Sequence, residues 1–166
     1  MVACMQATTA PTQASIDEIA LPLAGLMRHL VTRTSPDFFK EVERLELSFS
    51  QVKALNLLGD SDPLSVKGLS DALGLSVAGM SRAVEGLVQR GMVNRTEDPE
   101  DRRARCLTLA AKGARTMEGL VALRLAGIRA FVADLEPAER EALLPGLTML
   151  AERPEIKPVT PPEATS

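Results

Sequence analysis

Residues 65–91 read SVKGLSDALGLSVAGMSRAVEGLVQRG, and this stretch decides the fold. Ser65 and Ser76 each precede an apolar pattern at helical spacing, and a serine hydroxyl readily accepts hydrogen bonds from the unpaired N–H groups at a helix start. Gly74 lies between the two patterns and Gly91 follows the second, at positions where glycine commonly ends a helix. Two helices joined by so short a turn predict a helix-turn-helix. The predicted inward face of the second helix consists of Val77, Met80, Val84, Leu87 and Val88.

A β-hairpin is predicted directly after this pair of helices. Residues 92–96 and 104–109 have the short alternating pattern that is typical of strands. Successive side chains of a strand point to opposite faces. We therefore expect Leu107 and Leu109 on one face and Cys106 on the other, facing outward.

The predicted tip of the hairpin is densely charged. Residues 98–105 hold three acids and three arginines. Such a tip could be a salt-bridged turn, but surface ion pairs contribute only about 0–1 kcal/mol each. Stability alone therefore explains the cluster poorly. A hairpin beside a helix in the major groove can place an arginine in a narrow minor groove, where the potential is most negative.

The segment before the helix-turn-helix is also predicted to be helical. Ser15 and Ser48 each begin a capping box, in which a serine and a Glu or Gln three residues later bond each other's backbone. We expect Pro22 either to kink the first helix or to mark its first turn. A short amphipathic helix is predicted over residues 36–45, and the stretch 59–63 ends the helix that follows Ser48.

The segment after the hairpin predicts a long helix over residues 112–135 and a final helix that starts at Pro137 and is interrupted by Pro145. Residues 16–31 and 116–150 present more apolar surface than one small domain can bury. Large exposed apolar patches usually mark an interface, so we expect a homodimer.

Composition narrows the function further. The chain has 166 residues, a net charge of −3, 2% aromatic residues and no Trp or Tyr, which argues against base-stacking platforms for single strands. Residues 64–115 nevertheless carry +3, and the segments on either side carry −3 each. A local basic patch, rather than the total, decides whether a polyanion docks. We see no signal peptide and no charge-free stretch long enough to span a membrane. The two cysteines, Cys4 and Cys106, do not suggest a disulfide framework, so a reducing cytoplasm is expected.

Three stretches together resemble one family of proteins. They are LSFSQVKALNLL, PLSVKGLSDALGLSVAGMSRAVEGLVQRGMVNR and DPEDRRA followed by LTL and KG, in this order over residues 47–113. They are similar to the MarR family of bacterial winged helix-turn-helix regulators. The resemblance implies a mainly α fold with a small β-hairpin wing, and a homodimer whose recognition helices enter the major grooves of a palindromic double-stranded operator. It also implies a repressor that a small anionic or phenolic effector releases, with no cofactor or metal.

The resemblance also carries a division of the chain and a set of residues. The expected segments are a disordered 1–14, N-terminal dimerisation helices over 15–46, a DNA-binding domain over 47–113, C-terminal dimerisation helices over 114–152 and a flexible tail over 153–166. The expected recognition residues are Ser76, Ala78, Gly79, Ser81 and Arg82. In the wing, Asp101 should orient Arg103, while Arg95, Arg102 and Arg105 supply further positive charge. Arg28 and His29 are the candidate effector-binding residues, and we expect His29 to be a partly buried helix residue.

Several positions depart from the family pattern. Val77 stands where Pro is common, Gly79 where a hydroxyl residue is common, and Ala110-Ala111 where Thr-Pro is usual, which should weaken a helix cap. A single histidine and the absence of catalytic motifs argue against an enzyme. Two alternatives stay open: a winged helix that binds only proteins, and a redox sensor that acts through Cys106.

Overall fold

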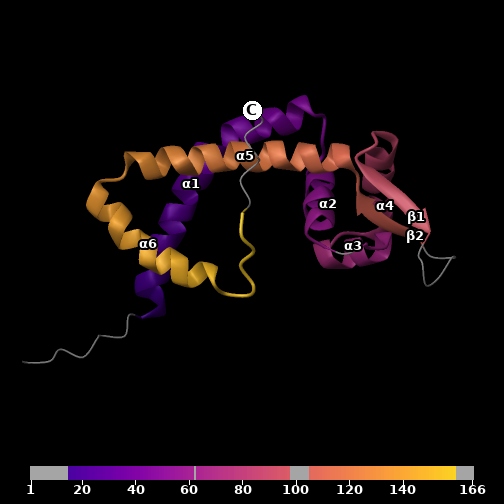
Figure 1. The fold of residues 1–166 in the computed structure, drawn as a ribbon. Coiled ribbons are helices and arrows are strands. Elements are labelled where there is room, and N and C mark those ends of the chain that lie inside the picture. The colour runs from indigo at the N-terminus through magenta and orange to yellow at the C-terminus, as the bar shows by residue number, and fades with distance from the viewer. Residues whose placement is uncertain (1–14, 62, 98–104, 160–166) are drawn as a thin grey trace, which may run out of the picture.

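The computed structural model describes residues 15–61, 63–97 and 105–159. Eight elements follow one another along this part of the chain: α1 (Ile16–Arg44), α2 (Phe49–Asp60), α3 (Val66–Leu73), α4 (Val77–Gln89), β1 (Val93–Glu97), β2 (Arg105–Leu109), α5 (Ala111–Asp134) and α6 (Pro137–Ala151). Figure 1 shows two parts. We call α1, α5 and α6 the arm, and α2, α3, α4 and the hairpin the lobe, which lies at one end of α5. The predicted mainly helical fold with a two-stranded hairpin is confirmed. The segment 1–14, for which disorder was predicted, and the last seven residues of the predicted tail lie outside the described residues.

The helix starts lie where the serine pattern predicted them. Ser15 and Ser48 both form complete capping boxes. The Ser15 backbone N–H donates to the Glu18 carboxylate at 2.7 Å, and this hydrogen bond lowers the pKa of Glu18. Ser65 and Ser76 cap α3 and α4. Gly74 ends α3 with φ +63°, a left-handed conformation that costs glycine little.

The predictions for Pro36 and Pro145 were wrong, and of the two alternatives for Pro22, a kink or a first-turn position, the second is excluded. Pro22 and Pro36 both lie inside one continuous helix α1, so residues 36–45 form no separate helix, and Pro145 does not interrupt α6. A proline inside a helix removes one hydrogen bond and costs about 3 kcal/mol. The packing of α1 along α5 offsets that cost for α1, and Phe38, just beyond Pro36, is buried. The ribbon of α1 in Figure 1 changes direction along its length.

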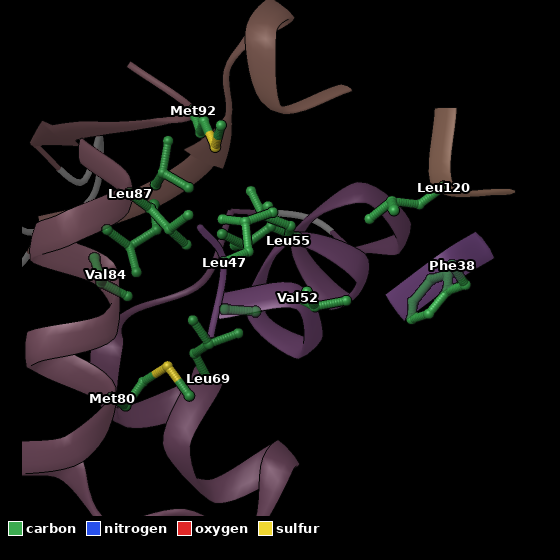
Figure 2. Packing of buried hydrophobic residues seen from close by; sticks show 14 residues of the cluster. Phe38, Leu47, Val52, Leu55, Leu69, Met80, Val84, Leu87, Met92 and Leu120 are labelled. Carbon is green, nitrogen blue, oxygen red and sulfur yellow. The ribbon is translucent and has the colours of Figure 1, made fainter. Parts of the chain in front are cut away.

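The core of the lobe is built from three helices and the hairpin. Leu55 of α2, Leu69 of α3 and Met80 of α4 have no exposed surface, and Figure 2 shows these side chains converging between their helices. Phe38 and Leu120 continue the same cluster into the arm. Val77 was expected in this core but is 50% exposed. A stripe at helical spacing is buried only where a neighbouring element covers it, and on α4 that cover begins at Met80.

The hairpin pairs in antiparallel register, with Val93 opposite Leu109 and Thr96 opposite Cys106. The backbone of Leu64 adds a single bridge on the other side of β2, because it exchanges two hydrogen bonds with Leu107 at 3.2 and 2.8 Å. Strand β2 is therefore a central strand at this point. Cys106, on the face of β2 opposite to Leu107, is only 8% exposed. The prediction that Cys106 faces outward was wrong.

The long helix α5 starts without a side-chain cap. Ala110 occupies the N-cap position and makes no side-chain hydrogen bond there, as the departure from Thr-Pro predicted. Its backbone N–H instead donates to the Met92 carbonyl at 3.0 Å, which fixes the start of α5 to the hairpin. Among the described residues, no helix is both long enough and apolar enough to cross a lipid bilayer.

Candidate nucleic-acid interface

Three of the predicted recognition residues, Ala78, Ser81 and Arg82, lie on the side of α4 that faces away from the core, whereas Ser76 is the N-cap residue and Gly79 is half-buried. Ala78, Ser81 and Arg82 are exposed, while Met80 and Val84 on the opposite side are fully buried. The periodicity of the apolar residues therefore predicted the exposure of these three residues correctly, but not that of Val77. We call the exposed face of α4 and the hairpin beside it the reading head.

The N-terminal end of α4 leaves room for close approach. The Ser76 hydroxyl accepts a hydrogen bond from the Gly79 backbone N–H at 3.1 Å, so it satisfies one of the unpaired donors of the first turn. A methyl group added at Gly79 would lie 3.0 Å from that hydroxyl oxygen. With Ala78 and Gly79 in this turn, an anion can reach the positive end of the helix dipole without meeting a bulky side chain.

Two arginines of the reading head differ in their partners. Arg95 on β1 lies 3.5 Å from the Glu85 carboxylate of α4, and the Arg95 side chain is only 26% exposed. This ion pair connects the hairpin to α4. Arg82 is exposed, and no acid pairs with it within residues 15–61, 63–97 and 105–159. Arg82 is thus a cation that a ligand can reach.

The structure describes only some of the predicted wing residues. Arg105 is exposed at the start of β2. Asp101, Arg102 and Arg103 lie outside the described residues. Val77 belongs to the reading head, although its apolar character predicted burial. The sequence offered one sign that Val77 is exposed: it stands at a position where the family commonly has Pro.

A cavity of about 300 Å³ lies between the arm and the lobe. It is mostly apolar, and two cations are held at aromatic rings in its wall. The Arg124 guanidinium lies 4.0 Å from the centroid of the Phe38 ring, and the Lys53 ammonium lies 5.1 Å from that of Phe49. The lining residues are Phe38, Phe49, Val52, Lys53, Asn56, Leu57, Leu73, Met117, Leu120, Val121 and Arg124.

The candidate effector residues lie elsewhere on the arm. Arg28 and His29 do not line this cavity. Both are exposed on α1, and the His29 ring lies 5.6 Å from the ring of Phe131 on α5. The expectation that His29 is partly buried was wrong, because α5 covers only one side of its ring. Arg28 and His29 were chosen as the basic residues nearest in sequence to the end of the first predicted helix. That criterion could not identify Arg124, which reaches the cavity from α5.

Known proteins resemble this chain in sequence and in fold. Residues 45–104 match the model of the MarR family. YfiV of Bacillus subtilis, described as an uncharacterised HTH-type transcriptional regulator, is 27% identical over 108 residues, which cover 65% of this chain and 68% of YfiV. The solved structure of the transcriptional regulator Tm0710 of Thermotoga maritima has a TM-score of 0.68, with 25% identity over 78% of this chain and 92% of Tm0710. A variant of MepR from S. aureus, solved bound to an oligodeoxyribonucleotide, has a TM-score of 0.62 and 20% identity over 77% of this chain and 94% of MepR.

The sequence match covers α2, α3, α4 and β1, and the structural match to Tm0710, which covers 78% of the chain, extends beyond this segment. Over residues 45–104 the chain is therefore similar to the MarR family, and its fold is that of the solved transcriptional regulator Tm0710.

Proposed function

We propose that this protein is a homodimer that binds a palindromic double-stranded DNA operator in the cytoplasm and represses transcription there. The observation that carries the proposal is the exposed face of α4. Small residues and Arg82, which has no acidic partner among the described residues, lie there opposite a fully buried stripe. A major groove about 12 Å wide admits such a helix. The solved MepR complex supports the proposal, because a chain of the same fold is bound there to an oligodeoxyribonucleotide.

Each residue of the reading head has a proposed part. Arg82 and Ser81 contact base edges or phosphates in the major groove, and the backbone of the first turn, at Ser76, Ala78 and Gly79, approaches a phosphate. Val77, exposed at the same end of α4, offers an apolar contact to a thymine methyl group.

The wing is proposed to reach the flanking minor groove. Arg103 enters the groove and Asp101 holds it in position, while Arg102 and Arg105 face phosphates. Arg95 is assigned a bracing part in addition to its charge, because its ion pair with Glu85 holds the hairpin against α4.

The division of the chain follows from where its apolar surface remains uncovered. Residues 47–113 form the proposed DNA-binding domain, and residues 15–46 and 114–152 form the dimerisation helices. Ile16, Ile19 and Leu21 on α1 and Leu144 and Leu147 on α6 are each more than half exposed. A second copy of the chain is the proposed cover of these side chains.

A small aromatic or phenolic anion is the proposed effector, and the cavity between arm and lobe is its proposed site. Arg124 and Lys53 supply positive charge to a pocket whose other walls are mainly apolar. This assignment replaces Arg28 and His29. Because α1 and α5 form one wall and α2 and α3 the other, an occupant would change how the lobe sits on the arm. Calorimetric titration with benzoate and salicylate tests this: binding should be lost in Arg124→Gln, and equal binding by both proteins would exclude the site.

The DNA-binding proposal is tested by retention of genomic fragments in a gel shift with excess non-specific competitor. The parent should retain a small set of fragments, and its affinity should fall steeply with salt, because phosphate contacts release counterions. Retention of no fragment, together with capture of a defined protein partner, would identify the chain as a winged helix that binds only proteins.

A further inference from the structure

Arg90, the residue that ends α4, reaches across the molecule to the end of α1. Its Nη1 atom donates to the Glu46 carbonyl oxygen at 3.0 Å, and its Nη2 atom donates to the Leu45 carbonyl oxygen. Glu46 adopts φ +50° directly after the C-cap residue Leu45, at the turn where α1 ends. The planar guanidinium therefore bridges two consecutive carbonyls of the turn that connects the arm to α2.

A second cation holds Arg90 from the other side. The Nζ atom of Lys112, in the first turn of α5, donates to the Arg90 carbonyl oxygen at 3.0 Å. The three contacts form a chain that runs from the start of α5 through the C-cap of α4 to the end of α1. Figure 1 shows α1 and α5 as the two long helices of the arm, with α4 in the lobe at their ends.

Each cationic group contacts carbonyls at the C-terminal end of another helix, where electrostatics favours a positive charge. The Arg90 guanidinium lies at the end of α1, and the Lys112 ammonium lies at the end of α4. The last carbonyls of a helix lack intrahelical partners and carry a partial negative charge. Hydrogen bonds from charged donors are stronger than those between neutral groups, and the fork of Arg fixes an orientation that a single amine does not. These links therefore restrain the direction of α4 as well as its position.

We infer that Arg90 is a positioning residue which, together with Lys112, fixes the recognition helix to the arm and so sets the half-site spacing that the dimer accepts. The inference rests on the proposed function. Two recognition helices of a dimer must meet major grooves about one helical turn apart. The arm carries the proposed dimer contacts, so the attachment of α4 to the arm determines the separation of the two helices. The C-terminal end of α4 is fixed, while its N-terminal end faces outward to read bases.

The first experiment separates spacing from base reading. Operators found by selection are remade with the same half-sites and a spacer one base pair shorter or longer, and affinities are measured by fluorescence anisotropy. The parent should prefer one spacing. In Arg90→Gln and Lys112→Gln that preference should fall by about tenfold, while the preference for the correct bases within each half-site stays. Arg153→Gln, beyond the end of α6 and outside the proposed dimerisation helices, controls for removal of a positive charge and should behave as the parent.

Lower stability alone would not change the spacing preference of the folded fraction. Arg90→Lys keeps the charge but lacks the fork, and should lie between the parent and Arg90→Gln. Unchanged spacing preference in both Arg90→Gln and Lys112→Gln, with only a lower Tm, would overturn the inference and leave these residues a structural role.

The second experiment needs neither DNA nor a dimer. Spin labels are placed by Ser81→Cys on α4 and Gly119→Cys on α5, in a chain that also carries Cys4→Ser and Cys106→Ala, and labelled chains are diluted with unlabelled ones. The parent should show one narrow intramolecular distance distribution, and Arg90→Gln should broaden or shift it. An unchanged distribution would refute the positioning role. If the parent bound no DNA but Arg90→Gln still broadened the distance distribution, the proposed function would be wrong and the positioning role of Arg90 would stand.

Discussion

Arg82 and Arg95 show how much the partners of a side chain decide its use. Both belong to the basic middle third of the chain, and the sequence treats them alike as DNA-binding candidates. In the structure Arg95 is paired with Glu85 and mostly covered, whereas Arg82 faces outward from α4 without an acidic partner in the described part of the chain. At the scale of single residues, Arg82 is therefore the side chain that should matter most for base recognition.

Replacing Arg82 by Ala should weaken operator binding by about 1–3 kcal/mol for each base that the arginine reads, and in a dimer this penalty applies in both half-sites. Sequence preference should relax at the corresponding base pairs. Anisotropy titrations on the selected operator and on single-base variants measure both effects. Arg153→Ala removes the same charge beyond the end of α6 and should leave affinity unchanged. An equal decrease of affinity in the two variants would show that only net charge matters.

Replacing Asp101 by Ala should weaken DNA binding even though it removes a negative charge from the wing. If Asp101 orients Arg103, this variant should resemble Arg103→Ala in part, with an effect that grows on AT-rich flanks and shrinks as salt rises. A model based on charge alone predicts tighter binding instead. Competition titrations at two salt concentrations decide, and tighter binding by Asp101→Ala would contradict the orienting role.

Which residues are exposed was predictable where the pattern is local and repeated. The faces of α4 followed from its apolar spacing, and Ala78, Ser81 and Arg82 are exposed as that spacing predicts. Val77 and Cys106 were misplaced for one reason. The spacing of apolar residues gives the side of an element on which they lie, but not how much of that side is covered. On α4 the cover begins at Met80, and on β2 the face of Cys106 is covered as well as that of Leu107.

At the scale of elements, one glycine decides how α5 meets the hairpin. Gly113 is buried, and a methyl group added there would collide with the Met92 carbonyl oxygen, which already accepts the Ala110 N–H. A carbonyl in the backbone cannot move aside as a flexible side chain can. Gly113→Ala should therefore destabilise the fold by about 1–3 kcal/mol, as overpacking generally does. Chemical denaturation measures the change.

Gly119 of the same helix provides the matched control. A methyl group added there meets nothing within 4 Å. Gly119→Ala should stabilise the protein by about 0.5–1 kcal/mol through the better helix propensity of Ala. Similar changes in both variants would mean that the close approach at Met92 is relaxed in solution.

The elements were predictable at their starts and less so in their interiors. A cap involves residues within one turn, so Ser15, Ser48, Ser65 and Ser76 located four helix starts correctly. Pro36 and Pro145 were wrongly predicted to begin or interrupt a helix, because whether a helix continues through a proline is not decided by local sequence. Whether a helix continues through Pro36 depends on what the residues beyond it pack against, and that partner is α5, far along the sequence.

At the scale of the whole molecule, the arm presents apolar side chains that the described chain does not cover. Leu144 of α6 is 66% exposed. Burial of a leucine is worth about 1.5–3 kcal/mol, and a two-fold interface counts it twice. Leu144→Asp should therefore raise the dimer dissociation constant by at least about a hundredfold. Sedimentation over a concentration series measures this shift, and a monomeric parent at micromolar concentration would contradict the dimer.

The assembly of distant segments is what the sequence predicted least. The cavity between arm and lobe takes lining residues from α1, α2, α3 and α5, and Arg124 lies far from Lys53 in sequence. No spacing rule connects such residues. The division into arm and lobe could be predicted from the apolar surface that one domain cannot bury and from the helix caps. The contacts that join the arm to the lobe, including those of Arg90, could be identified only from the three-dimensional fold.

The claim that α4 reads an operator as part of a dimer is tested most directly by a hydroxyl-radical footprint of the parent protein on a selected operator. Two recognition helices in successive major grooves and two wings in the flanking minor grooves predict a two-fold symmetric pattern, with the half-site centres about 10 bp apart. Arg82→Ala should weaken the central protections, and Arg103→Ala the outer ones. A protection pattern without two-fold symmetry, or protection that does not depend on DNA sequence, would contradict the claim.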